Sequence, residues 1–233
     1  MGDCALAVPA KAVSLTVRLS PDRQGLKVSL SGTPPSRQLG QLIRQYRPMF
    51  STVLTRQLPS PLPKLSGDPT DDFTALAALE VYMSAYQRSS PVSNTSPESS
   101  SGRLRPIETV EAWKDMITEL VAAGAWRQML YTLATSPPGP TRTENIRLLL
   151  DIVQSWTVPL SAPADSPGQP AAIQVERVNG QVVCRYRGIP PSPVINGWVW
   201  QNEHVLERAL ANGGPRHDCR HCNYVDHNPL PVS

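Results

Sequence analysis

The chain has 233 residues, and its composition excludes several classes of protein before any motif is considered. Hydrophobic residues make up 40% and charged residues 18%, which is enough apolar material for one hydrophobic core. With 14 Gly and 25 Pro, we expect long irregular segments but not a wholly disordered chain. No long apolar run and no basic-then-apolar leader occurs, so neither a membrane span nor a secretory signal is expected.

Charge is spread unevenly along the chain. Residues 1–66 hold nine basic and two acidic residues, a net charge of +7, whereas residues 67–160 carry −4 and residues 161–233 are balanced. Arginine accounts for 18 of the 22 basic residues, and its forked hydrogen bonds suit phosphate and carboxylate partners. The basic first third therefore suits a nucleic acid or an acidic lipid surface. It suits equally well the acidic middle of the same chain or of a second copy.

The first predicted element is a β-hairpin near residues 12–31. Apolar and polar residues alternate from Val13 to Leu19 and again from Leu26 to Leu30, which is typical of strands with one buried face. The segment between them, Pro-Asp-Arg-Gln-Gly at 21–25, favours a turn.

A helical region is predicted from about residue 36 to residue 156. Apolar residues recur at intervals of three and four from Leu39 to Val53, and Pro48 should kink or split this helix. A second helix is expected after 70–72, Thr-Asp-Asp, which we interpret as its N-cap and acidic first turn. The Ser- and Pro-rich stretch that follows, 88–105, is expected to be a flexible loop.

The last part of the helical region extends from Pro106 to Trp156. Apolar residues lie at helical spacing, with a break expected at Gly124 and a stop at the Pro-rich stretch 136–140. Thr141 and Glu144 match a capping box that would begin the next helix.

A second hairpin is predicted near residues 172–187, because two alternating runs flank Asn179-Gly180. A loop is expected at 188–197, followed by a short helix capped by Asn202. The fold class is therefore α+β, with a central helical core flanked by two β-hairpins that can pair into one small antiparallel sheet. We expect one domain over residues 1–214 and a separate Cys/His-rich tail over residues 215–233.

This tail holds the one cluster that suggests metal chemistry. Cys219 and Cys222 are spaced so that two thiolates can reach one tetrahedral zinc ion, and His227 follows five residues later. His217 is the expected fourth ligand, with His221 as the alternative. The spacing resembles the start of a retroviral-type zinc knuckle, whose last cysteine is replaced here by Val232. That resemblance covers about a dozen residues and implies contact with single-stranded nucleic acid.

Two other interpretations of the tail stay open. The zinc site can be completed by another part of the fold or another subunit, with Cys184 or His204 as candidates. The cysteines and histidines can also be incidental residues of an exposed tail.

The sequence lacks the dinucleotide-binding, Walker A, serine-hydrolase and zinc-protease motifs, so no enzyme is expected. A zinc hydrolase would need an open metal position with Asp218 or Asp226 beside it. We favour a non-enzymatic assembly or adaptor protein of the cytoplasm or nucleus, with a viral structural or accessory protein as one example. It would act through a protein partner or self-association.

The alternative function is a zinc-containing, RNA-binding protein that uses the basic first third and the tail. The phosphate and base contacts would then come from seven residues: Arg37, Arg44, Arg47, Arg56, Arg216, Arg220 and Tyr224.

If the tail binds zinc, the metal should co-purify with the protein and be lost when Cys219→Ser and Cys222→Ser are combined, because thiolates are the strongest ligands of the proposed set. Elemental analysis of the purified protein measures this. Absence of zinc from the unmodified protein would contradict the prediction.

Overall fold

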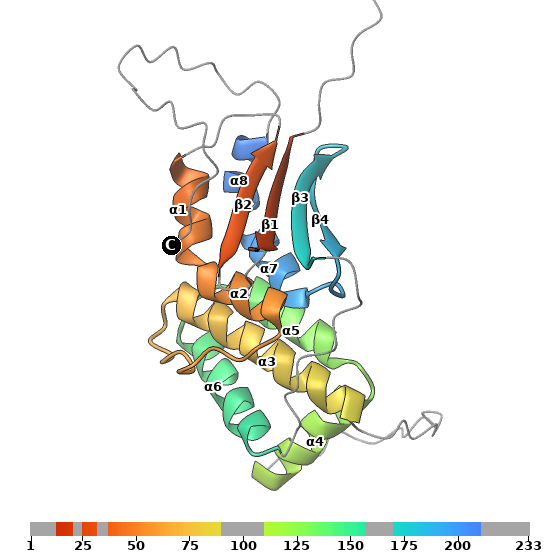
Figure 1. The fold of residues 1–233 in the computed structure, drawn as a ribbon. Helices are drawn as coiled ribbons and strands as arrows, with labels where there is room; N and C mark the ends of the chain where they lie inside the picture. Colours follow the sequence, from red (N-terminus) through yellow and green to blue (C-terminus); the bar gives the residue numbers. More distant parts are fainter. Residues whose placement is uncertain (1–12, 21–24, 32–36, 90–109, 157–169, 211–233) are drawn as a thin grey trace, which may run out of the picture. The chain divides into compact units, whose positions relative to one another are not determined.

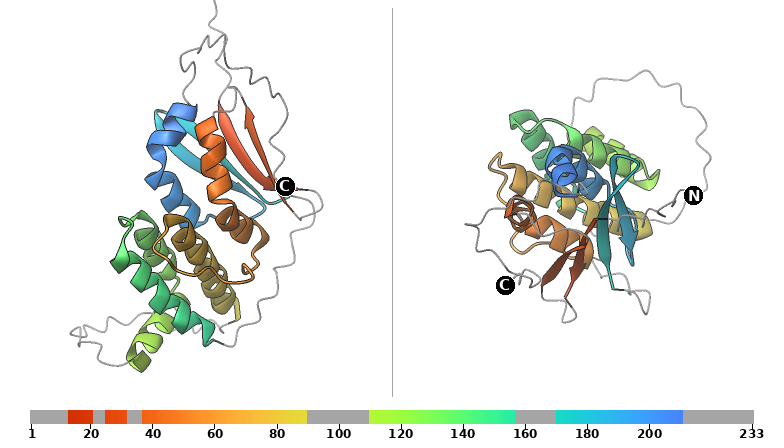
Figure 2. Two further views of the ribbon diagram at one scale, coloured as in Figure 1. Left: turned by 90° about the vertical axis from the view of Figure 1, so that its left-hand side faces the viewer. Right: turned by 90° about the horizontal axis from the view of Figure 1, so that it is seen from above.

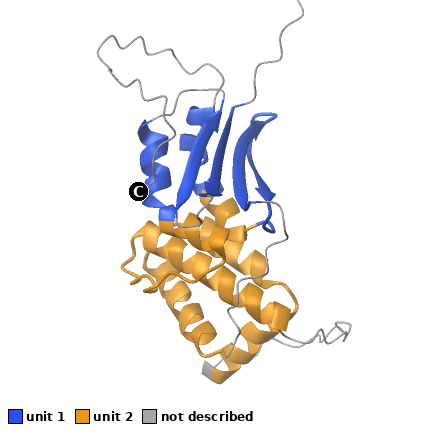
Figure 3. Cartoon of the chain, in the orientation of Figure 1, with its two compact units in different colours: residues 1–47, 166–191, 199–233 blue, residues 48–165, 192–198 orange. Residues whose placement is uncertain are grey.

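The computed structural model describes residues 13–20, 25–31, 37–89, 110–156 and 170–210. Figure 1 shows an α+β protein with helices and one small sheet, as the sequence predicts. The chain divides into two compact units (Figure 3). Unit 1 comprises Met1–Arg47, Ser166–Pro191 and Val199–Ser233, and unit 2 comprises Pro48–Asp165 and Ser192–Trp198.

Unit 1 is built on a four-stranded antiparallel sheet. Its strands are β1 (Ser14–Leu19), β2 (Leu26–Ser31), β3 (Ala172–Val178) and β4 (Gln181–Arg187), in the order β2-β1-β3-β4. The two predicted hairpins therefore join through β1 and β3, although about 150 residues of sequence separate them. A single hairpin is only marginally stable in water, so each hairpin is stabilised by pairing with the other in one sheet.

Apolar side chains explain why β1 and β3 pair. Leu15 lies opposite Val175 and Val17 opposite Ile173, and all four side chains are buried. Helices α1 (Arg37–Gln45) and α8 (Glu203–Leu210) lie on one side of this sheet (Figure 2). Helix α8 contacts β3 and β4, and α1 contacts α8. The apolar face of the sheet thus forms the core of unit 1 together with the buried faces of these helices.

Unit 2 is helical and is organised around α3 (Pro69–Ser89), which contacts three other helices of the unit. These are α4 (Val110–Ala122), α5 (Trp126–Thr135) and α6 (Pro140–Gln154). Both α2 (Arg47–Thr55) and the beginning of α7 (Pro193–Gln201) also contribute to the unit. Helix α3 is buried around most of its circumference, which is typical of a helix in the centre of a core.

Two helix starts differ from the sequence prediction. The Asp68 carboxylate, not Thr70, caps α3, since its Oδ1 accepts the N–H of Thr70 at 2.7 Å. Helix α6 begins at Pro140 with Gly139 as its N-cap, so the capping box predicted at Thr141 does not form. Proline has no N–H to donate. At the first helical position this costs no hydrogen bond, because the N–H of any residue there has no acceptor within the helix. The predicted interruptions at Pro48 and Gly124 are confirmed by the ends of α1 and α4.

The predicted loop at 188–197 is wrong in its second half, because α7 begins at Pro193. Ser192 supplies the start signal: its Oγ accepts the N–H of Ile195 at 3.2 Å. Burial of Val194, Ile195 and Trp198 outweighs the weak helix propensity of Gly197. Glycine is required there, since a Cβ would lie 2.3 Å from the Ala134 Cβ of α5.

Gly197→Ala should destabilise unit 2 by about 1–3 kcal/mol, because one added methyl group overpacks a close contact between helices. Ala134→Gly in the Gly197→Ala background should recover part of the loss, since it removes the atom that the new Cβ meets. Chemical denaturation of the two single variants and the double variant measures the coupling. Strictly additive effects would contradict the close contact.

Candidate functional site

The face of the sheet opposite the buried apolar one carries a row of basic side chains. The register places Lys27 beside Arg18, Arg18 beside Ala172, and Ala172 beside Arg187, so the row crosses all four strands. Directly paired residues of antiparallel strands share a face. Arg18 and Arg187 are exposed, and Lys27 is half-buried. We call Lys27, Arg18 and Arg187 the basic row.

Stability of the sheet does not account for the basic row. Arg18 lies directly opposite Lys27, and like charges in that arrangement are destabilising. Within the described ranges, no carboxylate forms an ion pair with any of the three residues. Strands lie about 4.8 Å apart, so the row spans about 14 Å, and its charge is available to a ligand.

The row next to it offers hydrogen bonds and one further cation. Its members are paired across the strands in the order Ser29, Thr16, Gln174 and Arg185. Arg185 forms an ion pair with Glu176, which is the one acidic residue of the four strands on this face, among the residues that the structure describes. The face as a whole is therefore cationic and polar.

The predicted contact residues that the structure describes are divided between its two units. Arg37 and Arg44 are exposed on α1, and Arg47 is half-buried at the start of α2; all three belong to unit 1. Arg56 belongs to unit 2. Sequence reasoning missed the basic row, because only the pairing of β1 with β3 places Arg187 in line with Arg18.

The tail residues His217, Cys219, Cys222 and His227 lie outside the described residues, as do Arg216, Arg220, Tyr224 and the alternative ligand His221. The zinc site therefore stays a prediction. In the part of the chain that the structure describes, no group of three or more His, Cys, Asp or Glu residues could hold a metal ion. Burial raises the pKa of the Cys184 thiol to about 12, so this candidate for completing the site is protonated at neutral pH. His204 is exposed on α8.

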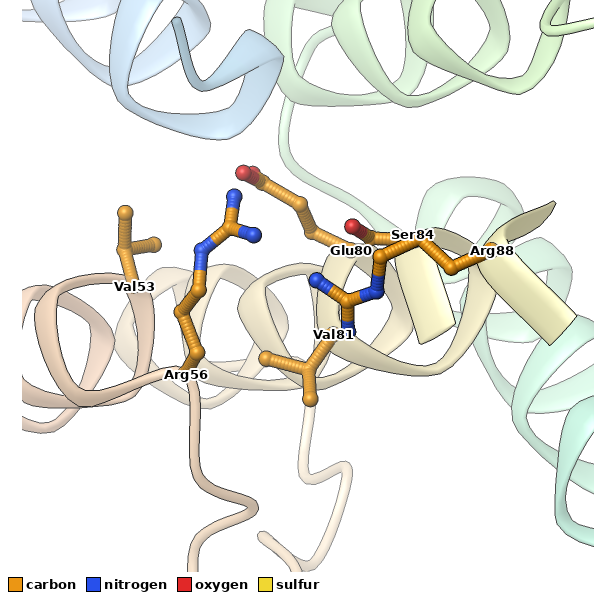
Figure 4. A pocket seen from close by; sticks show the side chains of 6 residues that line it. All are labelled: Val53, Arg56, Glu80, Val81, Ser84 and Arg88. Atoms are coloured by element: carbon orange, nitrogen blue, oxygen red, sulfur yellow. The ribbon is translucent and has the colours of Figure 1, made fainter. Parts of the chain in front are cut away.

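A cleft of about 260 Å³, open to solvent, lies on unit 2 between the end of α2 and α3 (Figure 4). Six residues line it: Val53, Arg56, Glu80, Val81, Ser84 and Arg88. Arg56 follows the last residue of α2 and has a φ of 55°, a left-handed conformation that turns the chain out of the helix. The other charged residues lie on α3, with Glu80 and Arg88 two turns apart.

Glu80 is a buried carboxylate held by the start of α7. Its Oε2 accepts the hydroxyl hydrogen of Ser192 at 2.6 Å, and the carboxylate also accepts the N–H of Val194. Burial raises the pKa of Glu80 to about 7, and these hydrogen bonds together with the charge of Arg56 oppose the rise. Sequence reasoning missed Glu80, because nothing in its neighbourhood distinguishes it from an exposed helical glutamate.

Two arginines, Arg56 and Arg127, interact with the charge of this carboxylate. Arg56 interacts with Glu80 and also with the like charges of Arg88 and Arg127, and its pKa is lowered chiefly by burial. Arg127 lies over the Trp126 ring, 4.4 Å from its centroid, and donates to Gln87 Oε1 at 3.4 Å. The cleft therefore combines one negative group with a surplus of positive ones.

Replacing Glu80 with Gln should remove a pH-dependent part of the stability. The folded pKa of about 7 lies above the ordinary value of 4.5, so between these values the folded protein holds a proton that the unfolded chain releases. The free energy of unfolding should therefore rise as the pH falls from about 8 to about 5, by up to roughly 3 kcal/mol. Glu80→Gln should lack this gain.

Chemical denaturation at several pH values measures the difference between the two proteins. Glu144→Gln, which removes an exposed carboxylate from α6, serves as the control and should keep the slope of the unmodified protein. The same slope in Glu80→Gln as in the unmodified protein would show that Glu80 does not titrate in this range.

Comparison of the chain with protein-family models, with curated proteins and with solved structures gives no match. Among the described helices, none has both the length and the apolar character needed to span a bilayer. Two features of the described residues suggest binding of an anion: the basic row on the sheet and the arginine-lined cleft.

Proposed function

We propose that the protein is a non-enzymatic nucleic-acid-binding protein that holds the phosphates of a single strand on the polar face of its sheet. The basic row carries this proposal. Three cations aligned over about 14 Å, without an acidic partner in the described residues, match the repeated charges of a polynucleotide backbone.

The neighbouring side chains favour a nucleic acid over other anionic partners. Ser29, Thr16 and Gln174 offer hydrogen bonds to phosphate and sugar oxygens. The one apolar member of the basic row, Ala172, is buried, so this row has nothing to insert into a lipid layer. Two of the three cations are arginines, whose planar fork matches a phosphate group.

Binding of this kind should depend on charge and not on base sequence. The basic row contains no aromatic side chain on which a base could stack, so its affinity comes from phosphate contacts. Contacts to bases would have to come from elsewhere, and the sequence assigns them to Arg216, Arg220 and Tyr224 in the tail.

The double variant Arg18→Gln/Arg187→Gln should weaken binding of a fluorescently labelled single-stranded oligonucleotide. The slope of log K against log salt should fall by about 1.4, since each phosphate contact contributes about 0.7 for single strands. Fluorescence anisotropy over a range of salt concentrations measures both quantities.

Arg147→Gln/Arg208→Gln is the matched control, because it removes the same charge from exposed arginines of α6 and α8 that are not predicted to contact nucleic acid. If the two double variants lose equal affinity for the oligonucleotide, the phosphate contacts lie outside the basic row and the proposal is overturned. So would equally tight, Arg18-dependent binding of polyglutamate or of phosphatidylserine vesicles, which would identify an acidic protein or a membrane as the partner.

Assembly with a protein partner is the second candidate, and exposed tryptophans support it. Trp126 and Trp198 are buried, but Trp200 on α7 is 55% exposed and Trp113 on α4 is 36% exposed. Tryptophan is enriched at protein interfaces, where it supplies a large apolar contact. A strict monomer in sedimentation, with no partner recovered at low or high salt, would count against this candidate.

A further inference from the structure

The cleft of unit 2 contains more positive charge than its own carboxylate can neutralise. Arg56 and Arg88 line it together with Glu80, and Arg127 lies close enough to interact with Arg56 and Glu80. Figure 4 shows the Arg56 guanidinium beside the Glu80 carboxylate, and the Arg88 guanidinium above Val81, directed toward Arg56. Arg56 and Arg88 carry like charges, which repel each other.

The carboxylate of Glu80 already has hydrogen-bond partners. It accepts hydrogen bonds from the Ser192 hydroxyl and the Val194 N–H at the start of α7. Within the described residues, neither Arg56 nor Arg88 forms a hydrogen bond or an ion pair at contact distance. Their donors are therefore available to a ligand that enters from solvent.

We infer that this cleft binds a phosphate group, held by the guanidinium groups of Arg56 and Arg88 with the Ser84 hydroxyl as a third donor. Two guanidinium forks can each form paired hydrogen bonds with a tetrahedral oxyanion. The burial of Arg56 strengthens its hydrogen bonds to the phosphate, since fewer water molecules compete for the same anion. The negative charge of Glu80 attracts Arg56.

The size of the cleft limits what else it encloses. Apart from the space open to solvent, the cleft encloses about 10 Å³, which is room for about one water molecule. A bound phosphate group therefore lies at the mouth of the cleft and not inside it, as free inorganic phosphate or as the terminal phosphate of a larger molecule whose remainder extends into solvent. This site lies on unit 2 and is independent of the basic row on unit 1.

Isothermal titration of the full chain with inorganic phosphate, at constant ionic strength in a chloride buffer, tests the inference. Arg88→Gln should weaken phosphate binding by about tenfold or more, because a charge-assisted hydrogen bond is lost. Arg88 is exposed, so this variant should fold normally, whereas Arg56→Gln removes a group beside a buried carboxylate. Arg147→Gln on α6 is the matched control of equal charge and should bind like the unmodified protein.

Further titrations separate the two sources of phosphate and the two sites. Tighter binding of glycerol 3-phosphate than of inorganic phosphate would identify a phosphomonoester as the ligand, and equal or weaker binding would identify the free ion. The Arg18→Gln/Arg187→Gln protein should bind phosphate unchanged, so failure of one site is distinguishable from failure of the other. Absence of binding at millimolar phosphate, equal affinity of Arg88→Gln and Arg147→Gln, or tighter binding of acetate than of phosphate would overturn the inference.

Discussion

The helical unit depends on the hydrogen bond between the Ser192 hydroxyl and the Glu80 carboxylate. Glu80 is buried on α3, where a carboxylate without partners would cost several kcal/mol. The start of α7 satisfies it with a hydroxyl and a backbone N–H, and the same Ser192 oxygen accepts the N–H of Ile195. One side chain therefore begins α7 and positions it against α3, 112 residues away in sequence.

A second buried carboxylate of α3 is satisfied in a similar way. Asp72 accepts the Thr143 hydroxyl hydrogen at 3.1 Å and forms an ion pair with Arg142 at 3.4 Å, with α6 supplying both partners. Burial raises the pKa of Asp72, and Arg142 and Thr143 oppose the rise. We predicted Asp72 only as part of an acidic first turn. Such pairs add little net stability, but an arrangement that separated them would leave a charge buried without a partner.

Two groups of basic side chains do not contribute to the stability of the fold. The basic row sets Arg18 opposite Lys27 across two strands, and the cleft sets Arg56 near Arg88. Both arrangements are unfavourable for the isolated protein, and both become favourable when an anion is bound. This shared property links the two proposals, although one concerns a polymer on a flat sheet and the other a single phosphate in a cleft.

The sequence by itself determined both hairpins, the helical character of the described residues 37–89 and 110–156, and the breaks near Pro48 and Gly124, because alternation, spacing and proline act locally. Only the tertiary structure decided which charged residues lie together, since the pairing of β1 with β3 and of α3 with α7 joins segments more than 100 residues apart. The start of α7 was missed for the same reason. The low helix propensity of Gly197 disfavours a helix in its local sequence. Its close contact with Ala134 forms only when α5 and α7 pack together.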